Sequence, residues 1–242
     1  MIITTTAIAF ISSSLGLGFC GVLFLKAAKK NGGFRVGNSL SFLLLGLIFS
    51  NAIQHAIMGF GHLFFVESLI VLHVVIILTS IFLALAAAFG IYLIFYLFSP
   101  RISPWPATLI TALYGIFVVI ATAVIPFSPF IDAGGGVDWN FPEWFEIVLY
   151  VLIFLNIGTL LAVFAVNFAK STDRRVKAVS LVIVLITLLG LVNIFLRFIF
   201  LPDTVGPART RFFDITLATI GLISIVGLSI IPLIRKRASN KK

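Results

Sequence analysis

The chain has 242 residues, of which 61% are hydrophobic and only 10% charged, and its mean hydropathy is +1.22. A soluble domain carries about 25% charged residues, so this composition excludes an ordinary soluble globular protein. The formal charge of +9 requires no nucleic-acid partner. Lys and Arg of cytoplasmic loops face anionic lipid, which stabilises each of them by about 1 kcal/mol near the membrane surface.

Apolar runs near the roughly 20 residues that cross the hydrocarbon core recur seven times. They predict an all-α membrane protein with one domain over residues 1–242 and seven transmembrane helices. In chain order, the helices are expected at about 4–26, 39–63, 67–97, 106–127, 145–168, 178–201 and 212–234. The connecting loops are short, so any functional site must be built from helix side chains or from those loops.

The basic residues predict the orientation of the chain in the membrane. Fourteen of the 17 Lys and Arg residues follow the first, third, fifth and seventh expected helices, whereas seven of the eight acids lie on the other side. Cytoplasmic loops are enriched in Lys and Arg. We therefore expect the N-terminus outside, the C-terminus in the cytoplasm, and a location in the cell membrane, most naturally a prokaryotic plasma membrane.

All three histidines lie in one predicted hairpin, "NAIQHAIMGFGHLFFVESLIVLH", residues 51–73. Each helical residue advances by about 100°, so four side chains of the second helix fall on one stripe within about 60° of one another. These are Asn51, His55, Met58 and His62, with Gln54 on the flank.

His55 and His73 are predicted to lie at matching depth. The turn of the hairpin falls near Glu67, which places both histidines about 12–14 Å below the outer surface. If the stripe faces the third helix, the two imidazoles could approach each other.

Three interpretations of this hairpin stay open. Its polar side chains could hydrogen-bond between helices and fix their packing. They could form a ligand or proton site, because titratable groups inside a membrane are functional candidates by default. Alternatively, His55 and His73 could ligate copper or a b-type haem, since imidazole suits both metals. Outside this last alternative, no cofactor is expected.

The later helices add further candidate residues. Arg197, near the outer end of the sixth helix, is expected to pair with Asp214 at the start of the seventh, or to face an anionic ligand. Asn193 lies one turn before Arg197 and joins the candidate pocket. The loop over 132–146 carries acids and glycines that could hold Ca²⁺, although solvated acids explain the pattern equally well. Trp105, Trp139 and Trp144 are expected in the interfacial aromatic belt.

Several functional classes are excluded by what the sequence lacks. No Lys lies inside a predicted helix, which excludes retinal bound as a Schiff base. No H-E-x-x-H, G-x-S-x-G or P-loop pattern occurs. Paired intramembrane carboxylates are also missing, so we do not expect an enzyme.

A possible internal repeat links the two ends of the chain. "FRVGNSLSFLLLGLIFSNAIQH" and "RRVKAVSLVIVLITLLGLVNIFLR" share Arg-Val, Ser-Leu and Leu-Gly-Leu, and they align Asn51 with Asn193 and His55 with Arg197. Such a repeat would give a 3+1+3 plan of parallel repeats. In length and topology this plan is similar to SWEET-type sugar carriers. A small-solute carrier is therefore one alternative function.

The short basic loop "AKSTDRRVK", the tight hairpin "GHLFFVESLIVLH" and the basic exit from the last helix also resemble the seven-helix membrane input regions of prokaryotic sensor kinases. No kinase domain accompanies them in this chain. The resemblance implies a non-enzymatic sensory input module, or an accessory subunit of a membrane complex, that works through a membrane-protein partner. The ligand-pocket candidates are Asn51, Gln54, His55, His62, His73, Asn193 and Arg197.

Overall fold

The computed structural model shows a bundle of long helices. The residues that it describes are 4–30, 39–65, 67–126, 128–131, 137–172, 174–195, 215, 218–219 and 221–222. Within these ranges, the helices are α1 (Thr5–Lys30), α2 (Ser39–Phe64), α3 (Leu69–Phe98), α4 (Trp105–Val124), α5 (Glu143–Lys170) and α6 (Arg174–Phe195).

Five of these helices, α1 to α5, are long and apolar enough to cross a membrane. The prediction of a multi-pass helical membrane protein is therefore confirmed. The bounds agree with the expected ones to within a few residues, and proline helps to place them. Pro106 occupies the first turn of α4 and Pro142 directly precedes α5, positions where the missing N–H of proline has no helical partner to lose.

The seventh expected helix lies mostly outside the described residues. Residues 215, 218–219 and 221–222 are helical. Gly221 packs so closely on α1 that an added Cβ would collide with the backbone of Ser12 and would lie 2.7 Å from the Ser13 nitrogen. The sixth and seventh spans, the internal repeat and the orientation of the chain remain predictions.

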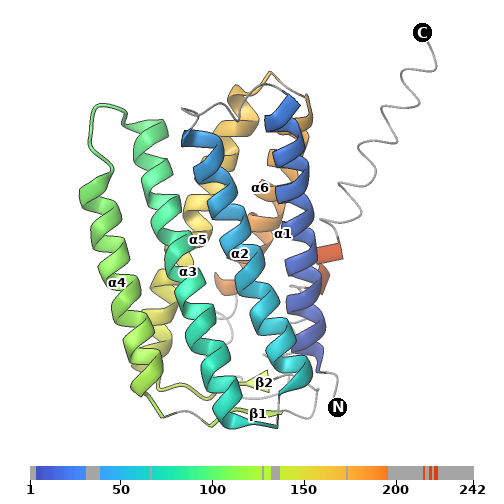
Figure 1. The fold of residues 1–242 in the computed structure, drawn as a ribbon, viewed down its shortest axis with the longest axis vertical. Helices are drawn as coiled ribbons and strands as arrows, with labels where there is room; N and C mark the ends of the chain where they lie inside the picture. Colours follow the sequence, from blue (N-terminus) through green and yellow to red (C-terminus); the bar gives the residue numbers. More distant parts are fainter. Residues whose placement is uncertain are drawn as a thin grey trace, which may run out of the picture.

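Helix α3 is the centre of the bundle, packing against α2, α4 and α5. Figure 1 shows α4, α3, α2 and α1 side by side in chain order, with α5 and α6 behind them. Helix α6 packs on α5 and on α1. Helix α2 packs mainly between α1 and α3, and part of its surface is exposed.

A short β ladder lies beside the end of the bundle where α2 ends and α3 begins (Figure 1). Strand β1 (Phe130–Ile131) pairs antiparallel with β2 (Val137–Asp138), with Phe130 opposite Asp138 and Ile131 opposite Val137. The backbone N–H of Val137 donates to Thr6 Oγ1 of α1 at 3.0 Å. This bond attaches the ladder to the first turn of α1.

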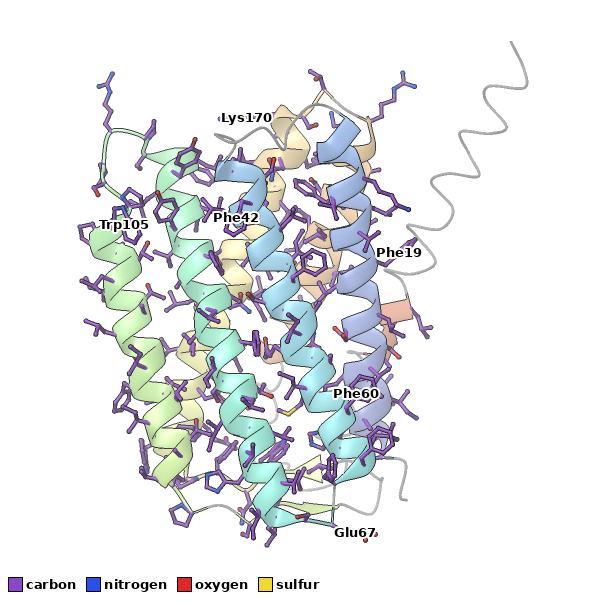
Figure 2. The ribbon with its side chains drawn as sticks, viewed as in Figure 1. Phe19, Phe42, Phe60, Glu67, Trp105 and Lys170 are labelled. Carbon is purple, nitrogen blue, oxygen red and sulfur yellow. The ribbon has the colours of Figure 1, made fainter. Side chains whose placement is uncertain are left out.

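The two ends of the bundle differ in charge. Figure 2 shows Lys170 at one end of the bundle, with Trp105 toward the same end, and Glu67 at the other end. Lys and Arg residues of the described ranges all belong to the Lys170 end, at positions 26, 29, 30, 101, 170, 174, 175 and 177. Glu143 and Glu146 open α5 at the Glu67 end. We call these the basic end and the acidic end.

The buried core also differs between the two halves. Toward the basic end, α1, α2, α3, α5 and α6 meet in an apolar cluster that includes Phe24, Leu47, Leu93, Phe164 and Ile183. Toward the acidic end, buried polar side chains of α1 and α2 accompany the apolar ones. They are Thr4, Thr6, Ser13, Ser50, Asn51 and His62. Polar groups this deep in an apolar bundle need hydrogen-bond partners.

Candidate functional site

Two asparagines join α2 to α5 near the middle of the bundle. Asn156 Nδ2 donates to Asn51 Oδ1 at 2.7 Å, and Asn51 Nδ2 donates back to Asn156 Oδ1 at 3.3 Å. Asn51 Nδ2 also donates to the carbonyl of Leu47 at 2.9 Å. Both side chains are buried, and each lies about halfway along its helix. This reciprocal pair fixes the register of α2 against α5.

His55 belongs to the contact between α2 and α1. Its Nδ1 lies 3.0 Å from Ser13 Oγ, so one of the two atoms donates to the other. The neighbouring Ser14 hydroxyl donates to the carbonyl of Ala52 at 2.8 Å. The aromatic ring of Phe10 lies 5.5 Å from the His55 ring between centroids. At His55 the polar stripe therefore faces α1.

His62 lies in the last turn of α2 and is completely buried. Its Nδ1 is 2.6 Å from the carbonyl of Met58. Because a carbonyl only accepts, Nδ1 carries the hydrogen, and the neutral ring presents a lone pair at Nε2. His62 Nε2 is buried and has no hydrogen-bond partner among the described residues.

Aromatic rings surround His62. Phe10 of α1 stacks against it, with centroids 6.1 Å apart and an interplanar angle of 9°. Trp139, which directly follows β2, meets the imidazole edge-on at 4.8 Å. Phe141 in turn stacks on Trp139 at 6.2 Å. We call His62, Phe10, Trp139 and Phe141 the acidic-end site.

His73 points away from this group. Its Nε2 lies 2.8 Å from the carbonyl of Thr122 on α4, whereas His55 contacts α1. Helices α1 and α4 flank the α2–α3 pair on opposite sides (Figure 1). The structure therefore does not bring the two imidazoles together, contrary to the approach that their matching depth allowed.

The other stripe residues complete this half of the core. Met58 Sδ accepts from Thr79 Oγ1 of α3 at 3.9 Å. Gln54 Oε1 is buried, and like His62 Nε2 it is an acceptor with no partner in the described part of the chain. Hydrogen-bond acceptors without donors therefore occur twice along α2. Leaving such a group unpaired costs about 1–3 kcal/mol.

Some predicted site residues lie beyond what the structure describes. Asn193 lies in α6, but its side chain is outside the described residues, as are Arg197 and Asp214. The predicted ion pair, and the correspondence of Asn51 with Asn193, remain predictions. The same holds for calcium at the loop acids, because residues 132–136 are not described.

Sequence reasoning missed three partners that define the site. Asn156 was not selected as a candidate, although a polar residue halfway along an apolar helix indicates a hydrogen bond to another helix. Ser13 was not singled out from the sequence at all. Trp139 was expected in the interfacial belt, but it is only partly exposed and packs on His62. Trp105 and Trp144 are 66% and 52% exposed, and the interfacial belt stays a prediction for all three tryptophans.

This arrangement suits recognition of a hydrogen-bond donor. His62 Nε2 supplies a buried lone pair, and the surrounding rings supply apolar and π surface. In the described ranges, no group of three or more His, Cys, Asp or Glu side chains is close enough to hold a metal ion. His62 is thus an isolated acceptor in an aromatic environment.

No protein-family model matches the sequence, and the comparison with curated proteins finds no match. Function must therefore be inferred from the residues of this chain.

Proposed function

We propose that this protein is a non-enzymatic seven-helix membrane protein that acts as a sensory input module. Its acidic-end site receives a ligand, and the helices that form the site pass the change to the basic end. The N-terminus lies outside and the C-terminus lies in the cytoplasm, so the site faces the exterior. A membrane-protein partner reads the change from the cytoplasmic side.

The observation that carries this proposal is the buried Nε2 of His62, which lacks a hydrogen-bond partner among the described residues and belongs to a ring in contact with Trp139. An interhelical contact that served packing alone would satisfy its polar atoms, as Asn51 and Asn156 do. A binding site instead keeps a polar atom available until the ligand arrives.

The route from this site to the basic end is a series of direct contacts. Phe10 touches both His62 and His55, and His55 contacts Ser13 on α1. One turn deeper, Asn51 holds α5 through Asn156. Helices α1, α2 and α5 therefore share the polar half of the core, and all three continue into the basic end.

A spin-label experiment tests this coupling. Lys26 of α1 and Lys170 of α5 are exposed at the basic end and are replaced by Cys for labelling, with the buried Cys20 changed to Ala. Distances between the labels are measured by pulsed electron resonance in lipid nanodiscs. Two variants, Trp139→Ala and His62→Phe, perturb the acidic-end site.

A sensory module predicts that both variants shift the distance distribution, because helix displacements in such switches are about 1–2 Å. Tyr114→Phe is the matched control, since it removes only the bond from the Tyr114 hydroxyl to the carbonyl of Val148 between α4 and α5. Superimposable distributions in all the proteins would overturn the sensory proposal. They would favour a rigid accessory subunit of a membrane complex.

A further inference from the structure

We propose that the acidic-end site binds a primary or secondary organic ammonium ion. This inference rests on the proposed function and names the class of ligand. The N–H of the ammonium donates to His62 Nε2, while its carbon groups lie against Phe10 and Trp139.

The first argument is the polarity of the unpartnered atom. The bond between His62 and the Met58 carbonyl fixes the hydrogen on Nδ1, so Nε2 of the neutral ring accepts and does not donate. The ligand must therefore bring an N–H or O–H. A carboxylate or a phosphate-monoester dianion has no donor hydrogen and would place lone pairs against a lone pair, which excludes these anions as the preferred class.

The second argument is the aromatic surroundings. Phe10 stacks on the imidazole with centroids 6.1 Å apart, Trp139 lies nearly perpendicular to it at 4.8 Å, and Phe141 stacks on Trp139. Aromatic faces attract cations through the ring quadrupole, and Trp does so most strongly. Neutral alcohols share the donor hydrogen but gain nothing from this attraction. The surroundings thus favour a cation over a neutral donor.

The third argument is the charge of the surface around the site. Glu67 and Glu143 are exposed at the acidic end, and Glu146 lies in the same first turn of α5. Within the described ranges, every Lys and Arg belongs to the other end of the bundle. A field of one sign attracts ligands of the opposite sign and raises their local concentration. The sequence places seven acids and three arginines on this side of the membrane, so its expected net charge is negative and favours cations over anions.

The test uses n-butylammonium as the probe on the full-length protein in nanodiscs. Trp105 and Trp144 are changed to Phe, so that Trp139 is the only fluorescent indole. Two matched compounds each remove one feature: tetramethylammonium has the charge but no N–H, and 1-butanol has the donor but no charge. Titration to about 10 mM covers the roughly millimolar Kd that a ligand of this size reaches.

The proposal predicts a saturable change in Trp139 fluorescence with n-butylammonium. The response to the other two compounds is at least about tenfold weaker. In His62→Phe, which keeps an aromatic ring but removes the acceptor, n-butylammonium binds about tenfold more weakly. The comparison of three compounds on the wild-type site needs no variant at His62, so it stands even if that variant misfolds.

Each other outcome would contradict a stated part of the proposal. No saturable change with n-butylammonium would overturn the ligand class, and so would an equal response to 1-butanol. An equal response to tetramethylammonium would overturn donation to His62. Binding of n-butylammonium without any shift of the basic-end spin labels would leave the site in place and overturn the sensory function. If the variants shift the label distances but n-butylammonium does not bind, the sensory function stands and the ligand class is overturned.

Discussion

The Asn51–Asn156 pair allows a quantitative prediction, because the two partners are not equivalent. Replacing Asn156 by Leu removes both bonds between the helices but leaves Asn51 Nδ2 bonded to the carbonyl of Leu47. One buried atom, Asn51 Oδ1, then lacks a partner. Replacing Asn51 by Leu instead leaves both Oδ1 and Nδ2 of Asn156 without a partner. Asn51→Leu should therefore be the more damaging change.

The expected magnitudes follow from the number of stranded atoms. Each stranded polar atom, with the loss of its bond included, costs about 1 kcal/mol, which is the low end of the range for buried groups and lies below the roughly 1.7 kcal/mol that bonds between membrane helices reach. We expect the free energy of unfolding to fall by about 1 kcal/mol in Asn156→Leu and by about 2 kcal/mol in Asn51→Leu. In the double Leu variant neither side-chain amide remains, so its free energy of unfolding should fall by about 1 kcal/mol or less.

The assay is reversible unfolding in mixed micelles with increasing dodecyl sulfate, followed by circular dichroism. The four proteins form a double-mutant cycle with a coupling energy of about 2 kcal/mol, far above the few tenths expected for independent sites. Additive losses would refute the reciprocal pair. Equal losses in the two single variants would refute the role assigned to the Leu47 carbonyl.

Three further predictions concern packing, topology and cofactor content. A Cβ added at Gly90 of α3 would lie 2.6 Å from Thr159 Cβ of α5, so Gly90→Ala should lower the free energy of unfolding by about 1–3 kcal/mol. At Gly158, where an added Cβ meets nothing within 4 Å, the same change should be nearly neutral, and equal losses at the two sites would contradict the close approach of α3 and α5. For topology, a Cys at Glu67 should react with a membrane-impermeant maleimide added outside intact cells, and a Cys at Lys170 should react only after lysis; the opposite pattern would reverse the orientation. Because the two imidazoles of the haem or copper alternative diverge, the reduced minus oxidised absorption spectrum should be flat, and a Soret difference band would restore that alternative.

The helices were predictable because their signal is local. A run of about 20 apolar residues can satisfy its backbone in lipid only as a helix, and charges and prolines limit its ends. The bounds of α2, expected at 39–63 and found at Ser39–Phe64, illustrate this. The polar stripe of α2 was also predictable, since it depends only on the helical period.

The direction of each polar contact was not predictable. Asn51 and His55 lie on one stripe, yet Asn51 contacts α5 and His55 contacts α1. This difference depends on how three helices pack around α2, which periodicity does not encode. His73 turns to α4 for the same reason. The contact of Trp139 with His62 was not foreseen either, because it depends on the β ladder and on the Val137–Thr6 bond, which hold its segment near α1.

The central claim is that His62 keeps a buried lone pair at Nε2 in the acidic-end site, and the protonation of its two nitrogens tests this most directly. Solid-state nuclear magnetic resonance of protein labelled with ¹⁵N-histidine in bilayers distinguishes protonated from unprotonated ring nitrogens, and His62→Gln assigns the signal. The account predicts a neutral ring with hydrogen on Nδ1 and an unprotonated Nε2 whose shift moves when n-butylammonium is added. A hydrogen on Nε2, as the other tautomer or as imidazolium, would contradict it.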